Sequence, residues 1–346
     1  MRRTTMKWNA GVLVLMALVL GACSDSKETR KQRFLLKGNE LLMKRNYPLA
    51  LKNYEEALRL DSCYADALNN LGTVYFRQKQ YAEALQYYST AIGCKPGFLN
   101  AHFNRANTFY ELGKPDDALR DIQYLKSEKP DTLTVHFLEG LVYTKKRDYS
   151  AALAAFDRAL AMDSLNAELW VNIGTVQYYA HNYGASRAAL VKAYTLNAAE
   201  ANAYNTLALV SAAEDKFEEA MNWITKALEL KPRDAFFLNN RGFIYLLQNN
   251  REAALEDINK SITLDPYNGW AYRNKGIYYL KSDDATAALR VLKQAVDLDP
   301  FIDEVFYYLA DAYLKTGDRT NACAAWNESK ARGENVKVHL NPCSTK

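Results

Sequence analysis

His102 and His136 come nearest to a metal-binding pair, because they lie 34 positions apart in a chain that has only 4 histidines. Imidazole nitrogens are common zinc ligands, and a zinc site takes at least three ligands from the protein. No third histidine or cysteine accompanies this pair at a metal-binding spacing. The equivalent positions elsewhere in the chain carry aromatic residues or leucine, so we expect both imidazoles to fill the core. We predict no metal site and no cofactor.

Motifs of catalytic sites are absent from the sequence. It has no glycine-rich phosphate loop, no nucleophile elbow and no cluster of histidine and cysteine. Aspartate and glutamate are plentiful but scattered, as a solvated surface requires. We therefore predict that the protein is not an enzyme.

The first of the 5 cysteines, Cys23, ends a segment that is typical of a secretory leader. Basic residues precede an apolar run over residues 10–20, which is about half the length that a membrane-spanning helix needs. The ending Leu-Gly-Ala-Cys resembles the bacterial lipobox, which implies cleavage before Cys23 and attachment of lipid to it. We expect residues 1–22 to be a signal peptide and residues 23–30 to be the lipidated cysteine and a linker. The alternative is an ordinary signal peptide in which Cys23 has no role.

The residue after Cys23 bears on the location of the protein. Ser24 stands there instead of aspartate, and by resemblance to lipoprotein sorting in bacteria with two membranes this favours the outer membrane. Loss of the leader lowers the formal net charge from +4 to +1, because the leader holds three basic residues and no acidic ones. A nearly neutral chain without a polybasic patch is not expected to bind nucleic acid. We expect a lipid-anchored protein of the bacterial cell envelope, and leave open which side of the membrane it faces.

A pattern with a period of 34 residues runs along nearly the whole chain. In residues 65–98, small and apolar residues recur at three- and four-residue steps in two stretches that are separated by a polar turn, which predicts a helical hairpin. Small residues let helix axes approach closely, and large residues such as Tyr54 fill the space beside them. One hairpin cannot bury its apolar face alone, so the copies must stack as a solenoid. The first small position reads Gly38, Gly72, Ala106, Gly140, Gly174, Ala208, Gly242, Gly276 and Ala310.

This repeat resembles that of the tetratricopeptide repeat family, whose helix-turn-helix unit has this length, these small positions and a closing proline. The resemblance implies an all-α fold, a right-handed solenoid of nine helix-turn-helix repeats over residues 31–336, with a tail over residues 337–346. Closing prolines are present at Pro96, Pro130, Pro232, Pro266 and Pro300, and are replaced at Ser62, Ser164, Ala198 and Glu334.

Four cysteines follow Cys23, an even number in a chain that we expect to leave the reducing cytoplasm. Cys323 lies on the second helix of the last repeat, and the tail is long enough for Cys343 to reach it. We predict a Cys323–Cys343 disulfide that pins the tail over the end of the solenoid. Cys63 and Cys94 end the second helices of neighbouring repeats and form either a second disulfide or two buried thiols.

Asparagines recur on the first helices, which line the concave face in a stack of this kind. Carboxamides both donate and accept hydrogen bonds, so a series of them can hold an extended peptide main chain. Asparagine is also common at this place in the family, so packing is the alternative for each. The candidates are Asn70, Asn104, Asn107, Asn172, Asn240 and Asn274.

Aromatic residues and one arginine are expected to face the groove in the last three repeats. This composition is typical of interface hot spots and suits an amphipathic helix or an extended segment of a partner. Packing between helices is again the alternative. The residues are Phe236, Trp270, Arg273, Tyr307 and Tyr308.

We therefore expect a non-catalytic scaffold or adaptor that binds a protein or peptide partner in its concave groove. The alternative is a surface lipoprotein that binds a glycan or another small solute by stacking on aromatic residues such as Trp270 and Tyr307. Certain tetratricopeptide domains bind a terminal carboxylate through lysines at set positions, but those lysines are missing here, so a chaperone-type clamp is not expected. The sequence does not indicate an oligomeric state.

Overall fold

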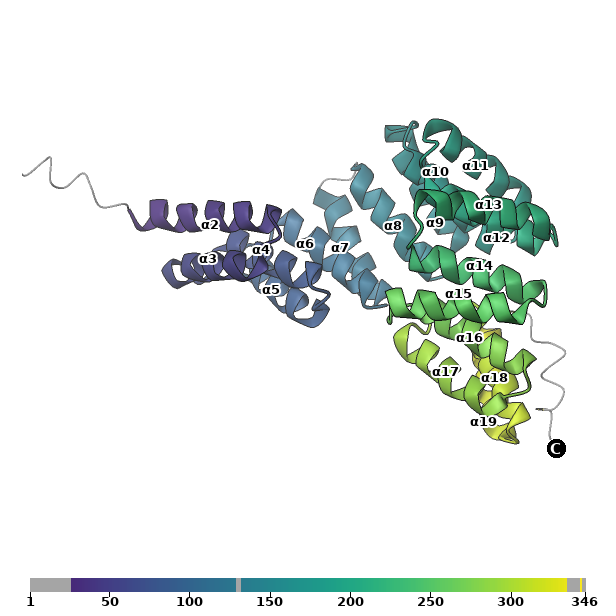
Figure 1. Cartoon of the computed structure of the whole chain (residues 1–346). Coiled ribbons are helices and arrows are strands. Elements are labelled where there is room, and N and C mark those ends of the chain that lie inside the picture. Colours follow the sequence, from purple (N-terminus) through teal and green to yellow (C-terminus); the bar gives the residue numbers. More distant parts are fainter. Residues whose placement is uncertain (1–25, 129–131, 335–342, 344–346) are drawn as a thin grey trace, which may run out of the picture. The chain divides into compact units, whose positions relative to one another are not determined.

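The computed structural model describes residues 26–128, 132–334 and 343, and these residues form 18 α-helices and no strand. Each odd-numbered helix packs back on the even-numbered helix before it, so the helices form nine antiparallel hairpins (Figure 1). The prediction of an all-α, right-handed solenoid of nine helical hairpins is confirmed. The chain divides into two compact units at residues 125 and 126, and each unit is described by itself.

Unit 1 holds three hairpins, stacked in chain order. The helices are α2 (Lys27–Met43), α3 (Tyr47–Leu60), α4 (Ala65–Arg77), α5 (Tyr81–Cys94), α6 (Leu99–Glu111) and α7 (Pro115–Glu128), the last of which runs across the unit boundary.

Unit 2 holds six hairpins that follow one another around a curve, from teal through green to yellow in Figure 1. Within it, each first helix contacts the first helix of the next hairpin, so that α10, α12, α14, α16 and α18 form one continuous inner layer. The helices are α8 (Leu133–Lys145), α9 (Tyr149–Met162), α10 (Ala167–Tyr179), α11 (Tyr183–Leu196), α12 (Ala201–Ala213), α13 (Phe217–Leu230), α14 (Ala235–Leu247), α15 (Arg251–Leu264), α16 (Gly269–Lys281), α17 (Ala285–Leu298), α18 (Val305–Lys315) and α19 (Arg319–Ala331).

Small residues at the repeat's first position make room for the large side chain of the facing helix. A Cβ atom added to Gly72 would lie 2.6 Å from Cε1 of the buried Tyr88, and one added to Gly174 would lie 2.6 Å from Cγ of Leu190. Real Cβ atoms do not approach other atoms so closely, so glycine is needed at these contacts. The core of each hairpin is therefore a small residue set against a large one, as the sequence predicts.

The turn inside every hairpin contains one residue with a positive φ angle, at the same place in each repeat. Glycine tolerates this conformation, whereas other residues adopt it at a cost in free energy. Only two of the nine positions hold glycine, so the surrounding turn imposes the conformation on the rest. The residues are Arg45, Lys79, Gly113, Arg147, His181, Asp215, Asn249, Asp283 and Gly317.

Connections between hairpins use carboxylate or carboxamide side chains whether or not the closing proline is present. The main-chain N–H of Cys63 donates to Asp61 Oδ1, and Asp163 and Asn197 accept in the same way from Leu165 and Ala199. Such side-chain turns reproduce the geometry of a main-chain turn. The same bond forms at Asp265 and Asp299, which precede closing prolines, so the turn does not depend on the proline.

No helix within residues 26–128 and 132–334 is both long and apolar enough to cross a membrane. The predicted signal peptide, the lipidation of Cys23 and most of the predicted tail lie outside the described residues.

Candidate functional site

A cavity of about 750 Å³ lies on the inner side of unit 2. Its wall consists of the first helices α10, α12, α14 and α16, together with the residues around the start of α18. The described part of the chain places none of its own helices inside it. This size lies within the range of pockets that bind small molecules or inserted side chains. The inner side of the curve is therefore a hollow that can accept another molecule.

The two ends of unit 2 meet beside this cavity through Arg147, in the turn between α8 and α9. Its Nη2 donates to Asp303 Oδ1 at 2.5 Å and to Glu334 Oε1 at 3.0 Å, and its Nη1 donates to the main-chain oxygen of Arg332 at 3.1 Å. These partners are at least 156 positions further along the chain. The nearby acids outweigh the effect of burial and raise the pKa of Arg147 above its usual value, so the group stays charged. The curve of six hairpins is thus closed by an ion-pair clasp.

Arg273, on α16, sits among three aromatic rings in the cavity wall. Its guanidinium carbon lies 5.2 Å from the ring centre of Phe243, 5.6 Å from that of Trp270 and 5.3 Å from that of Tyr308. Nη2 also donates to Glu304 Oε2 at 2.7 Å, whereas Nε has no acceptor among the described residues. Arg273 is only 5% exposed. Desolvation opposes its charge, but Tyr308, Glu304 and other neighbours outweigh it and hold the pKa of Arg273 above its usual value.

Asparagine side chains link neighbouring first helices in unit 2. Asn274 Nδ2 donates to Asn239 Oδ1 at 2.8 Å, Asn239 donates to Asn240 at 3.2 Å, and Asn240 donates to Asn205 Oδ1 at 2.9 Å. Asn274 is 1% exposed, so its amide serves this link and not solvent. Asn172 is different, because it donates to the main-chain oxygen of its own helix at Glu168. All three predicted asparagines of unit 2 nevertheless line the cavity.

The same arrangement occurs in unit 1. Asn104 Nδ2 donates to Asn69 Oδ1 at 2.9 Å, Asn69 donates to Asn70, and Asn70 donates to Asn39 Oδ1 at 2.8 Å. Asn107 lies on the same helix as Asn104 and is half-buried. These carboxamides tie each first helix to its neighbour, which is the packing role that the sequence left open.

Four of the five predicted groove residues of the last repeats line the cavity together: Phe236, Trp270, Arg273 and Tyr308. Tyr307 does not line it. It packs against the hydrophobic cluster around Ala310 and Trp326 and meets the Tyr308 ring edge-on at a centroid distance of 5.1 Å. Tyr307 and Tyr308 are adjacent on one helix, so their side chains point in different directions, and only one can face the cavity.

Residues that the sequence analysis did not single out complete the wall. Tyr178, Tyr179 and Tyr183 surround the turn after α10, while Asp303 and Glu304 precede α18. The turn lies near the start of α18 only because the six hairpins curve back, which no short sequence motif encodes. The group of three tyrosines within residues 178–183 was the available signal.

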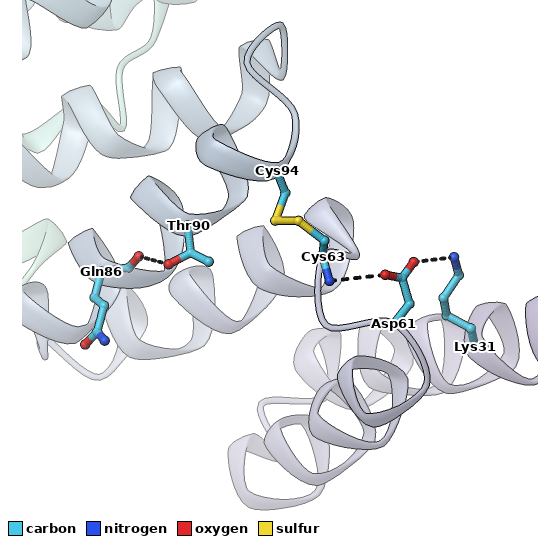
Figure 2. Close-up of a disulfide and its surroundings, with 6 residues drawn as sticks. All are labelled: Lys31, Asp61, Cys63, Gln86, Thr90 and Cys94. Carbon is cyan, nitrogen blue, oxygen red and sulfur yellow. Dashed lines mark hydrogen bonds and ion pairs between the residues drawn. A yellow bond between two sulfur atoms is a disulfide. The ribbon is translucent and has the colours of Figure 1, made fainter.

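Two disulfides are present. Cys63 and Cys94 are joined with a Cα–Cα distance of 5.4 Å, and Figure 2 shows this bond beside Asp61, which accepts from Lys31 Nζ at 2.8 Å. Cys323 and Cys343 are joined with a Cα–Cα distance of 5.5 Å. The first bond links the turn between α3 and α4, where Cys63 lies, to the end of α5, and the second holds Cys343 against the cluster around Trp326.

The two histidines pair with carboxylates. His102 Nδ1 lies 2.8 Å from Asp121 Oδ1 and its Nε2 lies 3.0 Å from the main-chain oxygen of Pro96. His136 Nδ1 lies 3.3 Å from Glu139 Oε2. Both imidazoles are buried. Within the described ranges, no group of three or more histidine, cysteine, aspartate or glutamate residues is placed to hold a metal ion.

Comparison with known proteins finds tetratricopeptide repeat models along most of the chain. They match residues 35–97, 103–169, 201–234, 237–268 and 273–334.

Curated relatives match over shorter stretches. DnaJ homolog subfamily C member 7 of Mus musculus is 33% identical over 104 residues, which is 30% of this chain and 21% of the relative. Hsp70-Hsp90 organizing protein 1 of Glycine max is 29% identical over 120 residues, which is 35% of this chain and again 21% of the relative. The chain thus aligns with about a fifth of the length of each of these relatives.

Solved structures with the same fold cover more of the chain. A tetratricopeptide repeat protein from Parabacteroides merdae superposes with a TM-score of 0.66 at 23% identity, over 72% of this chain and 98% of that one. A chain of the APC/C hetero-tetramer Cut9–Hcn1 superposes with a TM-score of 0.54 at 15% identity, over 96% of this chain and 81% of that one. The hairpins, their small residues and the models that match them lead to one conclusion: this chain belongs to the tetratricopeptide repeat family.

Proposed function

We propose that the protein is a non-catalytic scaffold that binds a segment of a partner protein in the cavity of unit 2. The observation that carries the proposal is the cavity itself, an inner surface where Phe236, Trp270 and Tyr308 meet asparagine side chains in one hollow. Large aromatic side chains in a partly enclosed pocket are the usual anchors of protein interfaces. Phe236 is 48% exposed, which is high for a phenylalanine that has no partner to cover it.

The second part of the proposal is that this scaffold is a lipid-anchored protein of the bacterial cell envelope, at the outer membrane. The leader-like start of the chain, the lipobox-like ending at Cys23 and Ser24 after it support this location. Two disulfides support it as well, because such bonds are rare in a reducing cytoplasm. Replacement of Cys23 by serine tests the anchor: we expect the protein to lose labelling by a fatty-acid analogue and to leave the membrane fraction. Unchanged labelling and fractionation would exclude lipid attachment at Cys23.

A chaperone-type carboxylate clamp is not part of the proposal. Hsp70-Hsp90 organizing proteins are among the relatives by sequence, but the alignment covers only a fifth of their length. At the place where such clamps carry lysine, this chain has Asn69, Phe103, Phe137 and Val171. Charge-assisted hydrogen bonds from basic side chains hold a carboxylate strongly, and none of these four residues is basic, which argues for a different ligand.

Affinity purification of the full chain from its own cells tests the binding site. Phe236→Ala removes an exposed anchor without touching the core, and we expect it to lower recovery of the partner about tenfold, as loss of a hot-spot aromatic does. Tyr267→Ala is the matched control, because Tyr267 is 73% exposed in the turn before α16 and does not line the cavity. Equal loss in both variants, or in neither, would exclude the cavity as the site.

Binding of a glycan or another small solute is the second candidate. It is favoured by one observation: the aromatic residues of the last repeats gather in one cavity and are not strung along an open groove. Trp270 and Tyr308 present rings that could stack on a sugar. Binding on a glycan array that Phe236→Ala abolishes, without any protein co-purifying, would support this candidate against the scaffold.

A further inference from the structure

The cavity of unit 2 has an unbalanced charge. Two of its five carboxylates are neutralised within the chain, Asp303 by Arg147 and Glu304 by Arg273. The other three form no ion pair with a described lysine or arginine. Arg273 is the one arginine or lysine among the described lining residues. The five carboxylates are those of Glu168, Asp215, Asp234, Asp303 and Glu304.

The three unpaired acids stand at both edges of the cavity. Glu168 lies in the first turn of α10 and Asp234 caps the start of α14, where its Oδ1 accepts from the N–H groups of Phe236 and Phe237 at 3.0 and 3.1 Å. Asp215 lies in the turn after α12 and is exposed. Because successive first helices run in the same direction, the first two acids mark one edge and Asp215 marks the other. A molecule that crosses the cavity meets a carboxylate on entering and on leaving.

Aromatic rings occupy the space between these acids. Tyr178, Tyr183, Phe236 and Trp270 line the wall, and the guanidinium of Arg273 already lies within 5.6 Å of the Trp270 ring centre. A cation bound over aromatic faces and beside a carboxylate gains from both, and the low-dielectric wall strengthens the attraction. The cavity wall thus already holds one arginine in the way that a second, incoming basic side chain would be held.

We propose that the partner segment is basic: an extended peptide that carries lysine or arginine side chains, which the unpaired acids and the tyrosine rings receive. This inference rests on the proposed scaffold function and adds the chemistry of the partner to it. An acidic segment would be repelled, because Arg273, the one arginine or lysine among the lining residues that the structure describes, is already paired with Glu304. A neutral segment would leave three carboxylates without a cationic partner.

Synthetic peptides test the inference on the full mature chain with its disulfides intact. Three fluorescein-labelled sets share the same aromatic residues and differ only in whether the remaining positions carry lysine, glutamine or glutamate. Fluorescence anisotropy should show the lysine set binding about tenfold more tightly than the glutamine set, with a strong weakening at high salt. The glutamate set should bind most weakly.

A charge-neutral variant locates the effect. Glu168→Gln, Asp215→Asn and Asp234→Asn remove the three charges while keeping side-chain size, and asparagine still caps α14. The matched control is Asp157→Asn, Glu229→Gln and Asp297→Asn, three exposed acids on second helices outside the cavity. We expect the first variant to lose the preference for lysine and the control to keep it.

The outcomes separate the two proposals. Equal binding of all three sets, weakened by Phe236→Ala, would contradict the basic partner while leaving the scaffold function in place. Binding of no set at all would contradict both. A lysine preference that survives the cavity variant but is lost in the control would place the site elsewhere and overturn the inference.

Discussion

Arg147 Nη2 and Asp303 Oδ1 lie 2.5 Å apart although 156 positions of sequence separate the two residues. The bond joins the first hairpin of unit 2 to the start of the last one, next to the cavity. Six hairpins thus complete enough of a turn for their ends to touch. This closure depends on the small rotation that each hairpin adds, and therefore on the packing of every hairpin between the two residues.

Loss of this clasp should destabilise unit 2. Arg147→Ala removes three hydrogen bonds to Asp303, Glu334 and the main chain, and we expect the free energy of unfolding to fall by about 1 to 2 kcal/mol. Thermal unfolding followed by circular dichroism should show a melting temperature lower by roughly 3 to 6 °C. Arg290→Ala, on the exposed face of α17, is the matched control. Equal melting temperatures for the two variants would show that the clasp contributes nothing to stability.

Glycine positions in unit 1 should respond to alanine in opposite ways. A Cβ at Gly72 would collide with the buried Tyr88 ring, whereas one at Gly93 would meet no atom within 4 Å. We expect Gly72→Ala to lower the free energy of unfolding by about 1 to 3 kcal/mol through overpacking. We expect Gly93→Ala to raise the free energy of unfolding by up to about 1 kcal/mol, because alanine favours the helix more than glycine does. Urea unfolding measures both, and a stable Gly72→Ala variant would contradict the close contact.

The positive φ angles in the turns inside the hairpins predict opposite effects on stability for two substitutions. Lys79 adopts a φ angle of 60° and Gly113, its equivalent in the next repeat, adopts 66°. Lys79→Gly should therefore stabilise the chain by up to about 1 kcal/mol, and Gly113→Lys should destabilise it by about 1 kcal/mol. If the two substitutions shift the urea midpoint in the same direction, the turn conformation is not what decides their effect.

Buried tyrosines should make the chain sensitive to alkali. Burial raises the pKa of Tyr54 and of Tyr88 to about 12, whereas tyrosine in an unfolded chain ionises near pH 10. The folded form keeps its protons longer, so this contribution to stability is complete below about pH 10 and is lost as the pH rises toward about 12. Unfolding free energies measured across this range should decline less steeply in the Tyr54→Phe and Tyr88→Phe double variant. The unfolding free energy of the control variant Tyr267→Phe, at an exposed site, should decline with pH as steeply as that of the unchanged chain. An equally steep decline in the double variant would refute the assignment.

The sequence was sufficient to predict the hairpins, because the contact of Gly72 with Tyr88 joins residues that are only 16 positions apart and recurs at this spacing wherever the first small position is glycine. It also placed Phe236, Trp270 and Arg273 on the inner face, since helical periodicity settles which side of a helix a residue occupies. It could not place Tyr178 beside Asp303, because that proximity arises from the summed rotation of several hairpins. The orientation of the Tyr307 side chain could not be predicted either, since it depends on packing against the cluster around Trp326 in the last hairpin.

Site-specific crosslinking in intact cells tests the central claim most directly. A photoreactive phenylalanine analogue is placed either at Phe236, in the cavity, or at Tyr267, outside it. We predict a covalent adduct with one partner from the position of Phe236, its loss when Trp270→Ala is added, and no such adduct from the position of Tyr267. If the analogue at the position of Phe236 forms no adduct, or if both positions give the same adduct, the result would contradict the account that this protein holds its partner in the cavity of unit 2.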